Sequence, residues 1–174
     1  MEILKVFKAL RFKFLSRNQR ITYYKKEGIK IGENLSIVGK VSFGSEPYLI
    51  SIGNNVRISN NVNFVTHDGG MHVLRNLGLL ENADKFGEII IEDNVFIGMN
   101  SIIMPGVRIG KNTVIGAGSI VTKSIDENTV ACGIPAKKIK SIEQYYEDNK
   151  DKVVYTKNMS NLEKKLFLMN ELNK

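Results

Sequence analysis

The sequence predicts an all-β solenoid, a parallel β-helix built from hexapeptide repeats. From Ile91 to Val121 an aliphatic residue recurs at every sixth position without a break, at Ile91, Ile97, Ile103, Ile109, Ile115 and Val121. Glycine directly follows three of these residues, at Gly98, Gly110 and Gly116. A helical face needs spacings of three and four residues, and a simple strand alternates every two. A constant step of six therefore indicates a coil in which each repeat forms one side.

A second inward-facing position comes four residues after each of these aliphatic residues, at Val95, Ser101, Val107, Thr113, Ser119 and Ile125. If about three repeats return the chain above itself, successive coils stack about 4.8 Å apart. Ile91 then lies beneath Ile109, and Ile97 beneath Ile115. Each buried aliphatic side chain contributes roughly 1.5 to 3 kcal/mol when it leaves water. A β-sandwich of short strands does not keep one register over six repeats.

Composition limits the class of protein. The 174 residues suffice for one structural unit with a real core. Lys and Arg number 25 against 18 acidic residues, a net charge of +7, which favours an acidic ligand or surface. Phosphate-bearing small molecules and anionic membranes both fit, whereas sparse aromatics and the lack of a recognition module argue against nucleic acid. The single cysteine, Cys132, excludes an internal disulfide and is expected to be a buried structural thiol.

Three segments are expected. Residues 1–28 form a basic amphipathic helix, from Met1 to about Arg20, and its lead-in, with apolar residues on one face at Ile3, Val6, Phe7, Leu10 and Phe14. This helix either caps the first coil, which we favour, or anchors the protein at a membrane surface. Residues 29–140 form the solenoid. Residues 141–174 form a helical tail in which Ser160 and Glu163 have the spacing of a capping box.

Charged residues interrupt every early apolar run, so we expect neither a signal peptide nor a membrane span. The expected location is cytoplasmic, with a peripheral contact at the inner face of the membrane if the first helix binds lipid.

Two interruptions of the hexapeptide period suggest where function lies. An insertion from Gly44 to Ile50 carries Glu46 and Tyr48. After Val65 the period breaks again, and a loop is ejected at about residues 68–87. His67 stands at the root of this loop, on the rigid coil, where an imidazole that changes charge near neutral pH is suited to general-base catalysis. His72, farther out on the loop, is a weaker candidate.

A third group of functional candidates is a basic cluster at the end of the solenoid, Lys137, Lys138 and Lys140, which is suited to phosphate.

These residues resemble the hexapeptide-repeat acyltransferases, in the branch that holds maltose, galactoside and nodulation O-acetyltransferases, polysaccharide O-acetyltransferases and xenobiotic acetyltransferases. The resemblance runs from about Ile31 to Lys140. Its most specific parts are Thr66-His67, IEDNVFIG at 91–98, MPGV at 104–107 followed by Ile109-Gly110, IGAGSIVTK at 115–123 and GIPAK at 133–137.

The resemblance implies a left-handed β-helix and a homotrimer whose active sites lie between subunits, with acetyl-CoA along the coils. Carried over by residue, His67 would be the catalytic base. Phe96, Met99, Ala117, Gly118 and Thr122 would line the path of acetyl-CoA, and Lys137 and Lys140 would meet its phosphates. Glu46 is similar to an acceptor-binding acid, and Tyr48 and Asp84 complete the candidate substrate-binding set. Asp84 and Glu81 are alternatives for the carboxylate that orients His67.

This chain departs from the family pattern at several positions. Lys137 and Lys140 replace arginine, Phe96 replaces tryptophan, Glu92 occupies a usual glycine position, and Met99 stands where a small residue is usual.

The expected function is acetyl-CoA-dependent O-acetylation of a sugar hydroxyl, on a surface polysaccharide or its precursor, with His67 as base, backbone N–H groups at the oxyanion and no metal. The alternatives are N-acetylation of a nucleotide-linked amino sugar, acetylation of an antibiotic, and a non-catalytic β-helix that binds a ligand. A metal-dependent hydratase on a similar coil needs three histidines, and the chain has two.

Overall fold

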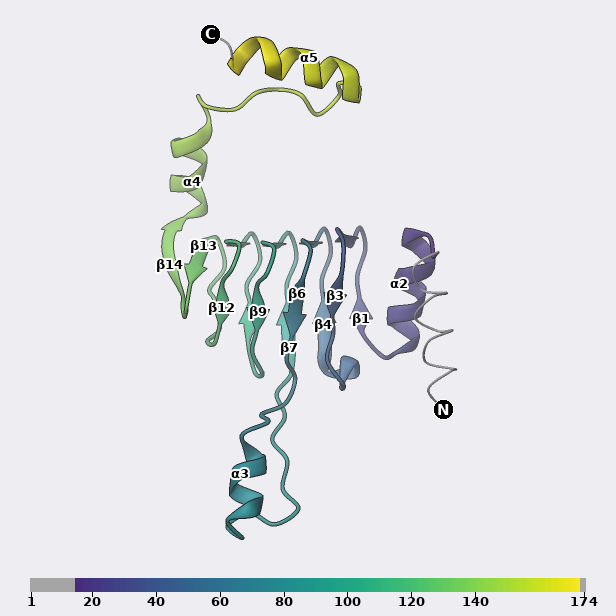
Figure 1. Ribbon diagram of the computed structural model, residues 1–174. Helices are drawn as coiled ribbons and strands as arrows, with labels where there is room; N and C mark the ends of the chain where they lie inside the picture. Colours follow the sequence, from purple (N-terminus) through teal and green to yellow (C-terminus); the bar gives the residue numbers. More distant parts are fainter. Residues whose placement is uncertain (1–14, 173–174) are drawn as a thin grey trace. The chain divides into compact units, whose positions relative to one another are not determined.

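The computed structural model describes residues 15–172 (Figure 1). The chain divides into two compact units, whose boundary lies between Ile142 and Glu143.

Three sheets of short strands make up most of the first unit. The first sheet contains, in spatial order, β1 (Lys30–Ile31), β4 (Ile50–Ile52), β7 (Ile89–Ile91) and β10 (Arg108–Ile109). The second contains β14 (Ala136–Ser141), β13 (Thr129–Gly133), β11 (Val114–Ile115), β8 (Phe96–Ile97), β5 (Arg57–Ile58) and β2 (Ser36–Ile37). The third contains β12 (Ile120–Val121), β9 (Ile102–Ile103), β6 (Val62–Phe64) and β3 (Val41–Ser42).

From β1 to β12 the chain visits the three sheets in turn, so each strand stacks on the strand three places before it in the sequence. Every named strand pair is parallel except β13 with β14. Ile91 is the register partner of Ile109, and Ile97 that of Ile115, as the sixfold period predicts. The parallel coil predicted from the hexapeptide period is therefore confirmed.

The core follows the two inward positions of the repeat. The six aliphatic residues from Ile91 to Val121 are each at most 1% exposed. Ser101, Thr113 and Ser119, at the second inward position, are buried as well. Their hydroxyls donate to backbone carbonyls, for example Ser119 Oγ to Gly116 O at 2.6 Å and Ser101 Oγ to Gly98 O at 2.8 Å. These bonds remove the cost of burying a hydroxyl inside the coil.

Gly98 is a position where the backbones of two coils approach closely. A Cβ at this position would lie 2.4 Å from the backbone nitrogen of Ala117, which cannot move without disturbing the next coil. We expect Gly98→Ala to lower the free energy of unfolding by about 1 to 3 kcal/mol, measured by urea denaturation. Gly69→Ala is the matched control, because a Cβ at Gly69 meets nothing within 4 Å. Equal unfolding midpoints for the two variants would contradict this reading of the coil spacing.

A helix, α2 (Arg17–Lys26), packs on the first coil. Ser16 caps its N-terminus in a capping box with Gln19. Tyr24 from the helix packs edge-on against Phe43, with ring centroids 4.7 Å apart, inside the core of the coil. The helix α2 begins at Arg17, with Ser16 as its N-cap. Residues 1–14 of the helix expected from Met1 to about Arg20 lie outside the described residues.

The solenoid ends in a β-hairpin instead of a further coil. β14 turns back antiparallel on β13, and Cys132 of β13 pairs in register with Lys137. The expectation of a buried thiol is wrong, because Cys132 lies on this outer hairpin and is only half-buried.

The tail contains α4 (Ile142–Asn149) and α5 (Asn161–Leu172). Before α5, Ser160 N donates to Glu163 Oε2 at 2.7 Å and Glu163 N donates to Ser160 Oγ at 3.3 Å, the reciprocal bonds of a capping box. No helix within residues 15–172 has the length and apolar character needed to cross a membrane.

Candidate functional site

His67 lies where the chain leaves the coil for the ejected loop. It follows β6 and forms an isolated antiparallel bridge with Phe86 on the returning side of the loop. Asp68 N donates to Lys85 O at 2.8 Å, and Gly87 N donates to Thr66 O at 2.9 Å. Between them the loop contains a short helix, α3 (Met71–Asn76), which extends away from the coils in Figure 1. These backbone bonds hold the imidazole on the rigid coil and not on the loop tip.

The earlier insertion brings a carboxylate to this histidine. The insertion forms a single 3-10 turn, η1 (Pro47–Leu49), directly after Glu46. Glu46 Oε2 accepts a hydrogen bond from Thr66 Oγ1 at 2.6 Å and lies 3.1 Å from His67 Nδ1. Ser45 Oγ lies 3.3 Å from the same ring nitrogen. The His67 side chain is 45% exposed, whereas that of Glu46 is 15% exposed.

The Glu46 carboxylate is stabilised in its charged form. The hydrogen bond from the Thr66 hydroxyl lowers the pKa of Glu46 below its usual value, burial opposes this, and bonds from Ser45 and His67 add to the lowering. A carboxyl group whose pKa is lowered in the fold stays charged at neutral pH. Glu46 therefore presents an anion to the Nδ1 side of the imidazole.

A cavity of about 310 Å³ opens beside His67. It is lined by Ser45, Glu46, His67, Asp68, Gly69, Arg75, Asp84, Lys85 and Phe86. Two ion pairs lie in its wall, Arg75 to Asp84 at 2.6 Å and Lys85 to Asp68 at 3.2 Å. The Phe86 ring is half exposed and meets the imidazole edge-on, with ring centroids 6.4 Å apart. An open cavity with an aromatic face, polar side chains and an imidazole can hold a polar acceptor against a base.

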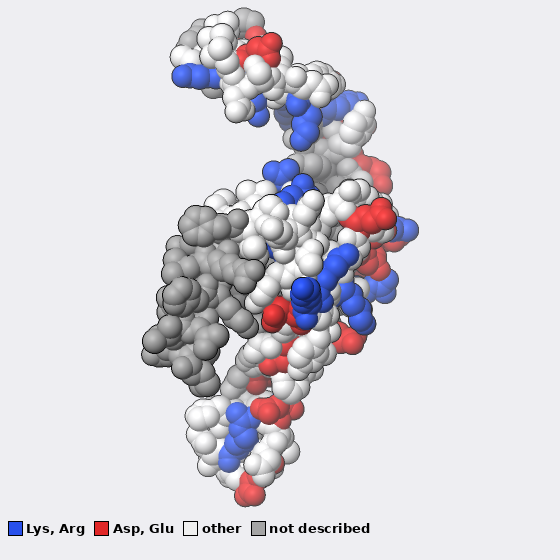
Figure 2. All heavy atoms as spheres, turned by 90° about the vertical axis from the view of Figure 1, so that its right-hand side faces the viewer, with Lys and Arg blue, Asp and Glu red and all other residues white. Residues whose placement is uncertain are grey.

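Acidic and basic side chains are mixed over the visible face, including the part of the excursion that carries α3 (Figure 2). The ion pairs in the cavity wall agree with this mixing, because each cation in the wall has an acidic neighbour.

The predicted substrate-binding residues are only partly brought together. Glu46 and Asp84 line the cavity, but Asp84 pairs with Arg75 and not with His67. Tyr48 is 60% exposed on η1 and does not line the cavity. His72 also lies outside the lining, and its Nε2 is 3.0 Å from Asn76 Nδ2. Sequence reasoning missed Arg75, Lys85 and Phe86. Lys85 and Phe86 stand next to the loop's return, which was their only signal, whereas Arg75 lies inside the loop in α3 and had none.

The predicted acetyl-CoA residues lie elsewhere on the coil. Phe96 points outward from β8 in the second sheet, and Met99 lies beneath Gly118 where the chain passes from the second to the third sheet. Ala117 precedes Gly118 at this corner. Of the remaining predicted acetyl-CoA residues, Thr122 follows β12, and Lys137 and Lys140 lie on β14. None of these residues lines the cavity beside His67.

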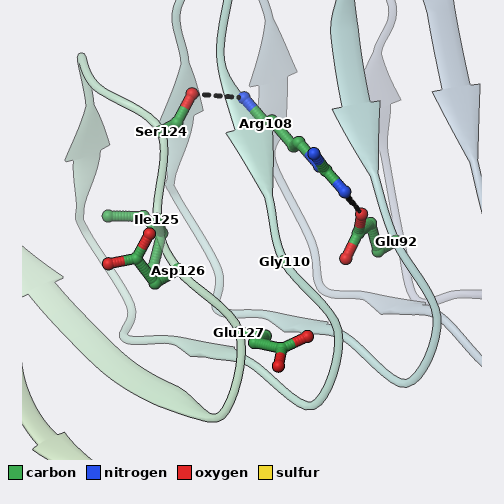
Figure 3. Close-up of a pocket in the computed structure, with 7 residues that line it drawn as sticks. All are labelled: Glu92, Arg108, Gly110, Ser124, Ile125, Asp126 and Glu127. Carbon is green, nitrogen blue, oxygen red and sulfur yellow. Dashed lines mark hydrogen bonds and ion pairs between the residues drawn. The ribbon is translucent and has the colours of Figure 1, made fainter.

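A second cavity, of about 490 Å³, lies at the end of the first sheet and is drawn in Figure 3. Glu92 from the end of β7 accepts the Arg108 guanidinium and the Lys111 backbone N–H, and Arg108 N donates to Ser124 Oγ at 3.0 Å. The bond from Arg108 is the main cause of the lowered pKa of Glu92. The ion pair between Glu92 and Arg108 joins two successive coils, which explains why an acidic residue occupies a position where glycine is usual.

Within residues 15–172, no group of three or more His, Cys, Asp or Glu side chains is placed to hold a metal ion. The cavity beside His67 is lined by acid–base groups and two ion pairs.

Comparisons with known proteins agree with the repeat pattern. The family model described as "Hexapeptide repeat of succinyl-transferase" matches residues 88–123. Protein CapG of Staphylococcus aureus is 46% identical over 166 residues, which cover 94% of this chain and 95% of CapG. A maltose O-acetyltransferase from Clostridium difficile 630 aligns with a TM-score of 0.59 and 30% identity, over 80% of this chain and 84% of that one. A galactoside acetyltransferase in complex with coenzyme A aligns with a TM-score of 0.57 and 30% identity, over 86% and 82%.

Proposed function

Because this chain belongs to the hexapeptide-repeat acyltransferases, we propose that it transfers an acetyl group from acetyl-CoA to a hydroxyl group of a sugar. The observation that carries the proposal is the placement of His67, fixed at a coil corner on the rim of an open cavity. Glu46 and Ser45 occupy the Nδ1 side of its ring, and no group among residues 15–172 bonds Nε2. Two relatives at 30% identity, over four fifths or more of this chain, bear the names of maltose and galactoside acetyltransferases.

His67 performs the proton transfers of the proposed reaction. Nε2 takes the proton of the acceptor hydroxyl as its oxygen attacks the thioester carbonyl. Backbone N–H groups at the coil edge stabilise the negative charge on the carbonyl oxygen. The carbon–sulfur bond then breaks, and the imidazolium returns its proton to the departing thiolate. The products are the acetylated sugar and CoA.

The surface around the second sheet is suited to a long, partly apolar thioester with phosphates at one end. Phe96 and Met99 are both exposed there, and a Cβ at Gly118 would meet nothing within 4 Å. Lys137 is exposed on β14 at the end of the same sheet. We assign acetyl-CoA to this surface, with Ala117 and Thr122 along its path and Lys137 and Lys140 at its phosphates.

We propose that the acetyl donor and the base meet where two copies of the chain adjoin. His67 stands where the chain leaves the third sheet, whereas Phe96, Met99 and Gly118 lie on the second sheet and its corner. This separation supports a homotrimer with active sites between neighbouring subunits. The same family relationship supports left-handed winding of the coil.

The cavity favours a neutral sugar over a nucleotide-linked amino sugar. Its two cations, Arg75 and Lys85, are each paired with a carboxylate in the cavity wall, so neither is free for a pyrophosphate. A sugar of a surface polysaccharide or of its precursor fits this wall. We propose that the enzyme acts in the cytoplasm.

Product analysis tests the proposed function. The protein is incubated with acetyl-CoA and a panel of neutral sugars, oligosaccharides, nucleotide-linked amino sugars and hydrophobic antibiotics, and the products are examined by mass spectrometry. An acetyl group that appears on a neutral sugar and is removed by mild alkali is an ester, as the proposal requires. An alkali-stable acetyl group found only on an amino sugar would refute O-acetylation.

Lys137 supplies a prediction about donor binding. We expect Lys137→Gln to raise KM for acetyl-CoA by about tenfold, because a charge-assisted bond to phosphate contributes about 1.5 to 3 kcal/mol. The KM for the sugar should stay unchanged. Lys30→Gln, at an exposed position on β1 in the first coil, is the control and should behave like the wild type. If both variants bound acetyl-CoA normally in a direct titration, Lys137 would not be a donor-binding residue.

A further inference from the structure

We infer that Glu46 is the positioning residue of His67, which fixes the orientation and tautomer of the imidazole so that Nε2 is the proton acceptor. This inference rests on the proposed function and assigns Glu46 a role different from the acceptor binding that its sequence resemblance suggests. It also explains the insertion after the first coil, since the insertion brings a carboxylate to the imidazole.

Two neighbouring side chains hold the Glu46 carboxylate in one position. Its Oε2 accepts the Thr66 hydroxyl at 2.6 Å and lies 3.1 Å from His67 Nδ1, so one oxygen serves both neighbours. Thr66 is completely buried, which confines its hydroxyl to this bond. The carboxylate is therefore held between a residue of the core and the ring that it supports. An acceptor sugar would have to compete with both bonds for this oxygen.

The other acidic residues near the loop bond to partners other than His67. Asp84 accepts from Arg75 at 2.6 Å, and Asp68 accepts from Lys85 at 3.2 Å and from Gly70 N at 3.0 Å. Among residues 15–172, Glu46 is the only carboxylate with a hydrogen bond to the His67 ring. The sequence-based alternatives for the orienting carboxylate, Asp84 and Glu81, are thus not in contact with it.

A negative oxygen at Nδ1 has two chemical effects. It accepts a hydrogen bond from Nδ1–H, which leaves the Nε2 lone pair free to take a proton from the acceptor. It also stabilises the imidazolium that forms once Nε2 has taken that proton. The remaining charges that face the ring are those of the two ion pairs, Asp68 with Lys85 and Arg75 with Asp84, and each pair is neutral in sum. Glu46 therefore supplies the net charge at the base.

The test compares Glu46→Gln with Glu88→Gln, an exposed acid outside the cavity. Steady-state rates of the full chain are measured with acetyl-CoA and the neutral sugar that the wild type accepts. We expect Glu46→Gln to lower kcat by about 10- to 100-fold, part of the 10²- to 10⁴-fold that a general base contributes. KM for the sugar should not change. The acidic limb of the kcat/KM profile should move to lower pH, because the variant lacks the charge that stabilises the protonated ring. Glu88→Gln should match the wild type.

Two results would overturn the inference. A raised KM for the sugar with kcat preserved would make Glu46 an acceptor-binding residue. A lowered kcat with an unchanged pH profile would show that Glu46 has only a structural role. Thr66→Val, which removes only the hydroxyl that holds Glu46, provides a second variant. We expect it to lower kcat by a smaller factor of about threefold to tenfold, and a normal kcat would count against the inference.

A spectroscopic readout separates this inference from the proposed function. The imidazole nitrogen-15 spectrum of the wild type should show His67 as the tautomer protonated on Nδ1, with His72→Gln used for assignment. Glu46→Ala should lose this single tautomer. A wild type that shows the tautomer but acetylates no sugar would refute the proposed function alone, whereas a ring protonated on Nε2 would refute the role of Glu46.

Discussion

His67→Ala is expected to lower kcat by about 10²- to 10⁴-fold, the contribution of a well-placed general base. The affinity for CoA should stay unchanged, because the residues assigned to acetyl-CoA lie on the second sheet, on its corner and near the end of the coil, and not in the His67 cavity. The loss falls on kcat since alanine cannot take the proton of the attacking hydroxyl. The measurement is steady-state thiol release with a saturating sugar acceptor, beside a direct titration with CoA.

His72→Ala is the matched control for this variant. The chain has only these two histidines, and His72 lies outside the cavity, where its Nε2 contacts Asn76 at 3.0 Å. We expect wild-type turnover from His72→Ala. Normal turnover from His67→Ala would show that His67 is not the general base. Loss of turnover in both variants would show that the loop as a whole is needed.

Ile97→Asp is expected to abolish folding. Ile97 is fully buried and lies in register between Ile58 and Ile115 in the middle of the second sheet. A carboxylate there loses its water with no donor to replace it and removes an aliphatic side chain worth roughly 1.5 to 3 kcal/mol. The combined cost approaches the whole stability of a domain, about 5 to 15 kcal/mol. We expect the variant in the insoluble fraction, without a cooperative melting transition by circular dichroism.

Ile90→Asp gives the same substitution on the outer face of a neighbouring sheet. Ile90 is 38% exposed on β7, where an aspartate keeps its water. This variant should remain soluble and melt cooperatively. If Ile97→Asp melted like Ile90→Asp, the assignment of inward positions from the sixfold period would be wrong.

The sequence predicted the coil well because one physical requirement repeats along it. Each hexapeptide must bury one aliphatic residue, so the period alone identifies Ile91 to Val121 as the core and fixes Ile97 against Ile115. The end of the coil was not predictable in this way. Val130 and Ala131 continue the register over β11, but the chain then reverses into β14, and the apolar pattern of a hairpin does not differ from that of a coil there.

The site was predicted less completely than the fold. His67 was predicted from its place at the root of an ejected loop, where the period itself marks the break, and it lies in the wall of a cavity. The contact between Glu46 and His67 depends on the path of one 3-10 turn, which no periodicity encodes. The pairing of Asp84 with Arg75 lies inside the loop, where the hexapeptide pattern has ended. The motifs suggested residues for acetyl-CoA but did not show that these residues lie outside the cavity beside His67.

The most direct test of the account is the release of thiol from acetyl-CoA by the wild-type chain, measured with and without a neutral sugar or oligosaccharide acceptor. We expect release that depends on the acceptor, saturates with its concentration and matches the amount of sugar ester formed. Measurable binding of CoA with no acceptor-dependent release for any sugar in the panel would contradict sugar O-acetylation. An absence of CoA binding would contradict the acetyl donor itself and favour a β-helix that binds a ligand without catalysis.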